Sequence, residues 1–353
     1  MIKVLVVGNS HSDTDLLDRI LRADPGLEII GRARTTQAAP GMTASLSPNV
    51  VVFDLHLPGA DEVSAIQAIM SATPTPVVVV AGSSSAEVEA GFDALAAGAL
   101  SVERRPPDEL HPGSEAAALA LISAVKAMAE VRVVRRRPLK TGKRDPEPKG
   151  HRQARIVALG ASTGGPAALR DVLAELPANY SLPLVIVQHI APGFSQDFVE
   201  WLSSASGFPV SLARHGDALM PSKAYLAPDD LHLEVTSRGI ISLTRQPAEH
   251  GMRPAVSVLF RSVCKQFGSN AVAVLLSGMG KDGALELKAL KDAGATTIVQ
   301  DKESSVVHGM PGEAIRLDAA QLILKPPEIG RALKSIPFLT GKTLPEALVM
   351  RGE

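Results

Sequence analysis

A serine, a histidine and an aspartate in this 353-residue sequence each lie at or just beyond the end of a short apolar run. They are Ser162, His189 and Asp282. A serine hydroxyl becomes a nucleophile when a histidine accepts its proton, and a carboxylate holds that histidine in orientation. Short apolar runs are typical of buried strands, and parallel strands present functional residues at their carboxyl ends. The three residues therefore indicate a serine hydrolase that attacks an ester carbonyl.

The serine lies in a glycine-rich segment, Gly160-Ala-Ser-Thr-Gly-Gly165, between a predicted strand at 155–159 and a predicted helix at 166–176. The G-x-S-x-G spacing allows a sharp turn that exposes the hydroxyl, and amides at the helix start stabilise an oxyanion. A dinucleotide-binding turn is the alternative. It requires glycine at 162 and an acidic residue about twenty positions on, but the next strand ends Val187-Gln188-His189. The pattern favours a nucleophile.

The choice of base stays open at this point. His189 lies at a strand end, whereas His308 would give the order serine, aspartate, histidine that is common in α/β-hydrolases. A surface histidine and a helix-capping aspartate are ordinary features when each occurs alone. Their coincidence at the ends of separate strands favours a site. Three further histidines lie in more polar loop contexts: His215, His232 and His250.

Two successive regions of the chain alternate apolar runs with helical patterns, which predicts two α/β domains with mostly parallel, doubly wound sheets. In the first region the predicted strands are 3–7, 27–31, 50–54, 76–81 and 100–102, and the helices are 14–23, 61–71, 86–97 and 114–129. In the second region the predicted strands are 155–159, 182–188, 224–227, 271–277 and 297–300, and the helices are 166–176, 256–267, 283–292 and 310–315.

A basic, proline-containing segment separates these regions. Between residues 132 and 149 it holds eight basic residues against two acidic ones. Nothing in it could form a core, and no aromatic residues interleave the charges as in a nucleic-acid-binding arm. We predict domains at 1–130 and 153–345, joined by a solvated linker at 131–152.

The overall composition excludes several classes of protein. The formal net charge is −1, which provides no global field for nucleic acid or membranes. No apolar run approaches the roughly 20 residues that span a bilayer. Cys264 is the one cysteine, so no intramolecular disulfide forms and a reducing compartment fits. We expect a cytoplasmic protein that neither inserts into membranes nor binds nucleic acid.

The motifs resemble those of the chemotaxis response-regulator protein-glutamate methylesterases over nearly the whole chain. The matching pieces are Gly160-Ala-Ser-Thr-Gly-Gly165, Gln188-His189, Leu226-Ala-Pro228 with His232, Ser277-Gly-Met-Gly-Lys-Asp-Gly283 and Gly309-Met-Pro311. The resemblance implies Ser162 as nucleophile, His189 as base and Asp282 as the orienting acid. It also implies oxyanion or substrate contacts from Met279 and Thr163, and no metal or organic cofactor for catalysis.

The same resemblance implies a flavodoxin-like receiver followed by a Rossmann-like serine hydrolase. The reaction would be hydrolysis of glutamate γ-methyl esters on methylated chemoreceptors, with deamidation of receptor glutamines in some members. The implied partners are those chemoreceptors and a chemotaxis-type histidine kinase. The architecture of the family also implies that the first domain occludes the Ser162 edge, so that deletion of residues 1–150 should raise the activity.

The receiver departs from the family pattern around Asp54, which matches the phosphoacceptor. Gly8 and Asn9 stand where an acidic pair binds Mg²⁺, Ala81 replaces a hydroxyl residue, and Arg105 replaces a lysine. Phosphoryl transfer to an aspartate needs a divalent cation, and arginine does not substitute simply for lysine. We therefore expect weak Mg²⁺ binding and consider a pseudo-receiver that docks without phosphorylation.

Smaller departures lie in the catalytic half, where His308 replaces an aromatic residue and Ser257 replaces a frequent aspartate. Two other functions compete with the methylesterase. One is a non-catalytic signalling adaptor, against which the complete set of serine, histidine and aspartate argues. The other is an unrelated small-molecule serine esterase that uses His308 as its base.

Overall fold

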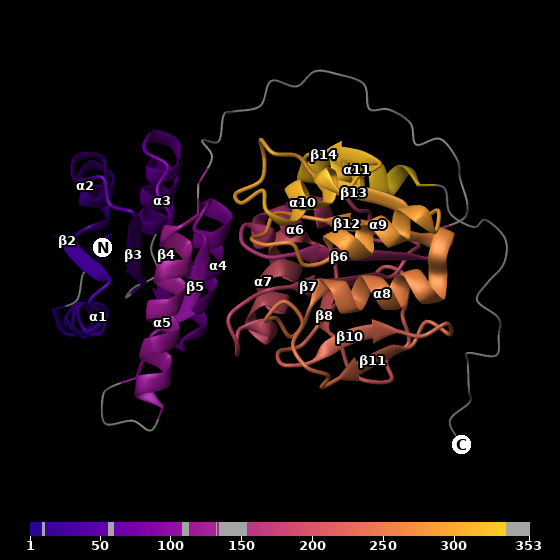
Figure 1. Ribbon diagram of the computed structural model, residues 1–353, viewed down its shortest axis with the longest axis horizontal. Coiled ribbons are helices and arrows are strands. Elements are labelled where there is room, and N and C mark those ends of the chain that lie inside the picture. Colours follow the sequence, from indigo (N-terminus) through magenta and orange to yellow (C-terminus); the bar gives the residue numbers. More distant parts are fainter. Residues whose placement is uncertain (9–10, 56–59, 108–112, 132, 134–153, 337–353) are drawn as a thin grey trace.

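The computed structural model describes residues 1–8, 11–55, 60–107, 113–131, 133 and 154–336, which form two α/β domains lying side by side (Figure 1). This confirms the predicted fold class. Nearly all of the predicted linker and the predicted end of the second domain at 345 lie outside the described residues. The predicted domain boundaries therefore stay predictions.

The first domain contains a parallel sheet in the order β2-β1-β3-β4-β5, which is the flavodoxin-like order. Its strands are β1 (Ile2–Val7), β2 (Leu27–Ala33), β3 (Val50–Leu55), β4 (Val77–Ala81) and β5 (Ser101–Arg104). Its helices are α1 (His11–Arg22), the short 3-10 helix η1 (Thr36–Ala38), α2 (Ala39–Leu46), α3 (Ala60–Ala72), α4 (Ser85–Ala97) and α5 (Ser114–Ala129). Asp54 lies near the carboxyl end of β3.

The second domain contains a parallel sheet in the order β14-β13-β12-β6-β7-β9-β8 and a separate antiparallel hairpin of β10 and β11. The strands are β6 (Ile156–Ala161), β7 (Leu184–Gln188), β8 (Val210–Leu212), β9 (Ala224–Leu226), β10 (His232–Val235), β11 (Ile241–Thr244), β12 (Ala271–Leu275), β13 (Thr296–Gln300) and β14 (Leu322–Leu324). The helices are α6 (Gly165–Leu173), α7 (Ser195–Ser206), α8 (Val256–Phe267), η2 (Gly268–Asn270), α9 (Ala284–Asp292), α10 (Met310–Arg316) and α11 (Pro326–Ser335).

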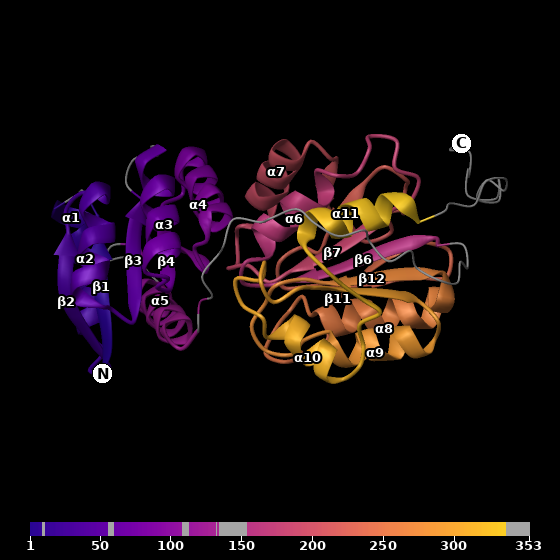
Figure 2. The same cartoon turned by 90° about the horizontal axis from the view of Figure 1, so that it is seen from above.

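Helices cover both faces of this second sheet, with α6, α7 and α11 on one side and α8, α9 and α10 on the other (Figure 2). Every residue of β6, β7 and β12 is buried as a result. A strand buried on both faces requires apolar residues throughout rather than in alternation. These three strands are neighbours in the sheet, and they are the ones that precede Ser162, His189 and Asp282.

The predicted elements agree with the structure closely in the buried strands and in the two helices α5 and α8, whose bounds coincide with the prediction. Helix α7 was missed, although Phe198, Trp201 and Leu202 follow a helical spacing. The hairpin was missed because β10 and β11 have four residues each. Helices α2 and α11 were also missed, and both begin at or beside prolines.

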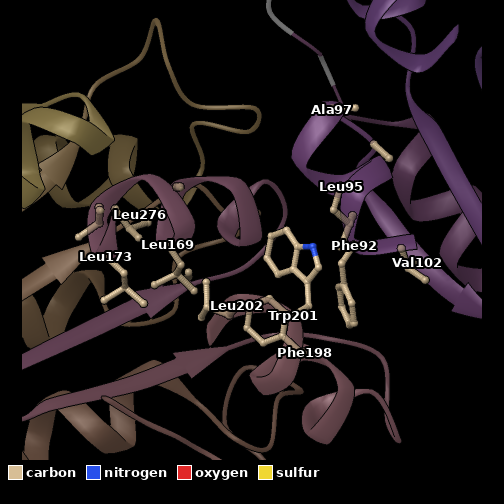
Figure 3. Packing of buried hydrophobic residues seen from close by; sticks show 14 of the residues in the cluster. Phe92, Leu95, Ala97, Val102, Leu169, Leu173, Phe198, Trp201, Leu202 and Leu276 are labelled. Carbon is tan, nitrogen blue, oxygen red and sulfur yellow. The ribbon is translucent and has the colours of Figure 1, made fainter. Parts of the chain in front are cut away.

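An aromatic cluster joins the two domains. Phe92 on α4 of the first domain packs against three rings of the second, with centroid distances of 6.1 Å to Phe194, 5.3 Å to Phe198 and 5.6 Å to Trp201. The Trp201 indole donates a hydrogen bond to Asp93 Oδ1 at 3.0 Å. Figure 3 shows Phe92 of the first domain beside Trp201 and Phe198 of the second. Each aromatic pair contributes about 0.5–1.5 kcal/mol beyond area burial, so the cluster holds the domains together.

A second contact lies between the end of the first domain and a loop of the second. Leu100 and Val131 are buried together with Val306. The loop that carries Val306 hydrogen-bonds to the turn after β12, since Val307 O accepts from Gly278 N at 3.0 Å. The first domain therefore contacts two segments that adjoin the carboxyl edge of the second sheet.

Candidate active site

The serine lies in a tight turn between β6 and α6. The Ser162 amide donates to Ser277 O at 3.0 Å, and the Gly165 amide donates back to Ser162 O at 2.7 Å. Gly164 has a φ of 78°, and a Cβ there would lie 2.6 Å from Val306 Cβ. Only glycine fits this position without strain. The turn holds the Ser162 side chain in a nearly buried place, with 8 % of the residue exposed.

The histidine is placed beside the serine by strand pairing. β6 and β7 are parallel neighbours in which Ala161 lies opposite Gln188, so Ser162 and His189 each follow one member of a pair. The His189 amide donates to Ala161 O at 3.0 Å. The buried Gln188 side chain donates to Ser162 O at 2.9 Å and to His189 O at 2.7 Å. One side-chain amide thus fixes the backbone of both residues.

The aspartate completes the arrangement from β12, on the other side of β6. Asp282 Oδ2 accepts from His189 Nε2 at 2.9 Å and from the Val256 amide at 2.7 Å, while Oδ1 accepts from the Ser257 amide at 2.9 Å. The two amides open helix α8, whose N-terminus carries partial positive charge. Burial by itself raises the pKa of Asp282, but bonding to His189 and Ser257 outweighs it and holds that pKa at about 2. The carboxylate stays ionised.

The strand order explains which imidazole nitrogen bonds to Asp282 and which is left without a partner. The ring extends from β7 toward β12 and must pass over β6, the strand between them. The far nitrogen, Nε2, reaches Asp282, whereas Nδ1 is buried and receives no hydrogen bond from the described residues. With a proton on Nε2, Nδ1 keeps a lone pair and is the nitrogen able to take the proton of Ser162. No hydrogen bond joins Ser162 Oγ to His189 among the described residues, and such bonds often tighten only when substrate binds.

Two backbone amides near the serine have the properties of oxyanion donors. They belong to Thr163 and Met279, and neither donates to an acceptor within the described part of the chain. Met279 follows Gly278, whose position is so close to the serine that a Cβ there would lie 2.8 Å from Ser162 Cβ. Met279 is itself 44 % exposed. This places an apolar, accessible side chain at the rim of the site.

His308 occupies a different position from His189. Its backbone pairs with Gly278, and its Nδ1 lies 3.3 Å from Ser305 Oγ. Burial, aided by the charge of Lys302, lowers the pKa of His308. Asp282 has no contact with it, so the structure pairs the carboxylate with His189 and leaves His308 at the edge of the turn.

The other described histidines lie outside the arrangement of Ser162, His189 and Asp282. His232 is buried, accepts from the Ala255 amide at 3.2 Å and bonds to Pro247 O at 3.1 Å, so it supports the segment that leads into α8. His215 Nδ1 accepts from the Leu243 amide in the hairpin, and His250 lies in a turn with a φ of 53°.

Three supporting residues were not recognised as functional in the sequence. Besides Gln188, Ser257 Oγ accepts from the Gly283 amide at 2.9 Å and so ties α8 to the turn that carries Asp282. Ser277 Oγ donates to Thr163 O at 2.7 Å and accepts from the Val307 amide at 3.0 Å. Gln188 and Ser277 belong to the motifs that carry the family resemblance, but their supporting roles could not be predicted because their hydrogen-bond partners are distant in sequence.

Asp54 lies far from this arrangement, in the first domain, where Arg105 forms an ion pair with its Oδ1 at 2.6 Å. No group of three or more histidine, cysteine, aspartate or glutamate side chains is arranged to hold a metal ion within the residues described above. In the same residues, no helix is long and apolar enough to cross a membrane.

Comparison with known proteins gives a consistent result. Residues 157–333 match the CheB methylesterase family. The chain is 46 % identical, over 97 % of its length and 99 % of the relative, to a protein-glutamate methylesterase/protein-glutamine glutaminase of Nitrosospira multiformis. It is 47 % identical to one of Geobacter metallireducens, over 95 % of this chain and 99 % of the other. The catalytic domain of the Thermotoga maritima CheB methylesterase has a similar structure, with 34 % identity, a TM-score of 0.51, and coverage of 52 % of this chain and all of that one.

The Asp282→Asn substitution tests the role of the buried carboxylate. We expect the free energy of unfolding to fall by about 1–3 kcal/mol at neutral pH, because the amide cannot accept all three hydrogen bonds. Folding lowers the pKa from its ordinary 3.8 to about 2, so this stabilisation is complete above pH 3.8 and disappears as the pH falls through about 2. Denaturant titrations between neutral and acid pH measure the difference. Asp292→Asn, at an exposed site on α9, is the control and should show no such loss.

The Gln188→Leu substitution tests the amide that bridges the serine and histidine backbones. The backbone carbonyls of Ser162 and His189 each lose one donor, so we expect the rate of Ser162 labelling by a fluorophosphonate to fall by about tenfold, which corresponds to roughly 1.4 kcal/mol in the activation barrier. Mass spectrometry of the labelled protein provides the rate. Thr297→Val removes a comparable buried hydrogen bond, to Ala319 O, far from the serine. An equal loss of labelling in both variants would show that Gln188 acts only on general stability.

Proposed function

This chain belongs to the CheB methylesterase family, and on that premise we propose that Ser162, His189 and Asp282 carry out its reaction on methylated chemoreceptors. The activity is that of a protein-glutamate methylesterase, a hydrolase of carboxylic esters. The observation that supports the assignment most strongly is the 2.9 Å bond between His189 Nε2 and the ionised Asp282, directly beside the serine turn.

The reaction begins when Ser162 Oγ attacks the γ-carbonyl carbon of a methylated glutamate and His189 Nδ1 accepts the hydroxyl proton. Asp282 stabilises the imidazolium that forms, as in other serine hydrolases. The negative charge that develops on the carbonyl oxygen is bound by the amides of Thr163 and Met279. Collapse of this tetrahedral intermediate returns the proton to the methoxy oxygen, and methanol leaves.

A glutamyl ester of Ser162 remains. Water then attacks the same carbonyl carbon, with His189 again accepting a proton, and a second collapse releases the serine and a free glutamate side chain. The chain's own residues supply every proton transfer in this sequence. We infer that deamidation of receptor glutamines follows the same steps, with ammonia in place of methanol, as the names of the relatives suggest for those proteins.

The observed contacts agree less well with the other two candidate functions, a signalling adaptor and a small-molecule esterase. Binding by a non-catalytic adaptor does not require a buried carboxylate that orients a histidine near a serine. A small-molecule esterase with His308 as base would need an orienting acid there, but Asp282 bonds to His189 instead. We further propose that the enzyme works in the cytoplasm, where the single cysteine fits a reducing compartment, and that a chemotaxis-type histidine kinase is a partner.

Regulation by the first domain forms part of the proposal. Arg104 at the end of β5 donates a hydrogen bond to Gly193 O and lies 4.4 Å above the Phe194 ring. Both residues belong to the segment that follows His189. On the other side, Val131 packs on Val306, next to the turn that contains Met279. A large receptor helix must approach this edge, so a docked first domain obstructs it.

Methanol release from methylated chemoreceptor membranes tests the catalytic assignment. We expect Ser162→Ala and His189→Ala to abolish release above background, a fall of about 10³-fold or more. His308→Ala keeps most of the activity because His308 does not contact Asp282. Release that survives His189→Ala but is lost in His308→Ala would instead support the alternative base.

Deletion of residues 1–150 tests the obstruction. We expect faster methanol release from the shortened protein than from the full chain, because the receptor helix then reaches the Ser162 edge without displacing a docked domain. A catalytic domain of this family has been solved by itself, which supports independent folding. Equal turnover by both proteins would contradict the obstruction.

A further inference from the structure

Three charged side chains gather at the end of β3 in the first domain. They are Asp54, Glu87 on α4 and Arg105, and we refer to them as the Asp54 cluster. Arg105 NH2 bonds to Asp54 Oδ1 at 2.6 Å and to Leu55 O at 2.6 Å, while its NH1 bonds to Glu87 Oε1 at 3.0 Å. The Asp54 side chain is 1 % exposed, and those of Arg105 and Glu87 are 16 % and 14 % exposed. One guanidinium therefore joins two nearly buried carboxylates.

The residues that the structure describes around Asp54 do not provide the ligands of a magnesium ion. Mg²⁺ requires octahedral oxygen ligands, typically one or two carboxylates with waters and phosphate oxygens. Gly8 has no side chain to offer, and Asn9 lies outside the described residues. Asp54 Oδ1 already accepts hydrogen bonds from Arg105 Nε at 3.2 Å and from NH2 at 2.6 Å, and the guanidinium offsets the carboxylate charge that would attract a divalent ion. The chain therefore provides its own cation beside Asp54.

The donors that would stabilise a further anion are also in use. Glu87 accepts from the Gly82 amide at 3.3 Å, from Ser84 Oγ at 2.6 Å and from Arg105. Burial alone raises the pKa of Glu87, but the bonds from Ser84 and Arg105 outweigh it and hold that pKa below its ordinary value. A phosphoryl group on Asp54 would compete with this carboxylate for the same amide and guanidinium.

The Asp54 cluster is connected to the domain interface through both of its outer members. Glu87 is on α4, the helix that carries Phe92 and Asp93 into contact with Trp201. Arg105 follows Arg104, and neighbouring side chains of a strand end point in opposite directions. Arg105 therefore bonds to the other members of the Asp54 cluster, whereas Arg104 contacts Gly193 O and the Phe194 ring of the second domain.

We propose that the ion pairs of Arg105 with Asp54 and Glu87 stabilise the docked state of the first domain. Arg105 provides the positive charge and Glu87 the second negative charge beside Asp54. It follows that Mg²⁺ and a phosphoryl group are not its signals. Undocking instead requires that the Arg105 bridge between β5 and α4 be broken, for example by a partner protein that takes Arg105 or Glu87. This inference goes beyond the methylesterase activity, and only one of the measurements below depends on that activity.

Trp201 provides a direct readout, because it is the only tryptophan of the chain and lies at the interface. Calorimetric titration of the full-length protein with Mg²⁺ and beryllium fluoride, a phosphoryl analogue, should give no saturable heat, and Trp201 fluorescence should not change. Saturable, Mg²⁺-dependent binding that is lost in Asp54→Asn would overturn the proposal.

Variants of the Asp54 cluster test whether its ion pairs stabilise the docked state. Arg105→Ala should shift Trp201 emission to the red, as the indole becomes exposed, and should raise methanol release by about fivefold or more, the lower end of typical couplings between sites. Arg32→Ala is the matched control: it removes an ion pair of the same domain, with Asp18 at 2.8 Å on the far edge of the sheet, and should change neither signal.

Glu87→Gln keeps the shape of the side chain while removing its charge, so it decides the question if Arg105→Ala does not fold. Emission and activity unchanged by a folded Arg105→Ala, or by Glu87→Gln in its place, would contradict the proposal. The fluorescence result stands even if no variant releases methanol, since that outcome would count against the catalytic assignment and not against the docking device.

Discussion

The carboxylate of Asp282 makes the interaction on which the catalytic half of this protein depends. Its two oxygens accept three hydrogen bonds, from His189 Nε2 and from the first two amides of α8. A buried charge is tolerated only when it is neutralised and hydrogen-bonded, and here a helix terminus and an imidazole do both. The low pKa of this group follows from the same contacts. Loss of any one of these three hydrogen bonds would leave a buried donor without its acceptor.

This interaction is possible because of the strand order. β12, β6 and β7 are adjacent, parallel and wholly buried, so the residues that follow them meet at one edge. Neighbouring strands are about 4.8 Å apart, and an imidazole that starts at β7 passes over the serine on β6 before it reaches the acid. The sheet thereby determines which histidine reaches Asp282 and which of its nitrogens is left for the proposed role of base.

The sequence allowed prediction of the α/β class, of most central strands and of the strand ends at which Ser162, His189 and Asp282 lie, because long apolar runs and glycine turns are local signals. It could not choose between His189 and His308 on physical grounds, since the choice depends on which strands are neighbours. The contact between Phe92 and Trp201 also joins residues far apart in the chain. Arg105 was visible as a departure from the receiver pattern, but its partner Glu87 emerged only when α4 was placed beside β5. Short elements such as β10 and β11 carry too little periodicity to be recognised.

The end of β5 is one of the places where the two halves of the protein are linked. Arg104 contacts the segment after His189, and Arg105 contacts Asp54 and Glu87, so a change in the first domain can affect the loop that follows the proposed base. The most direct test of the account concerns that base. Long-range ¹H–¹⁵N NMR of the His189 imidazole in the resting enzyme reports which nitrogen is protonated. The account predicts a proton on Nε2, shared with Asp282, and a bare Nδ1. A resting proton on Nδ1 would contradict it, because that nitrogen could not then accept the proton of Ser162.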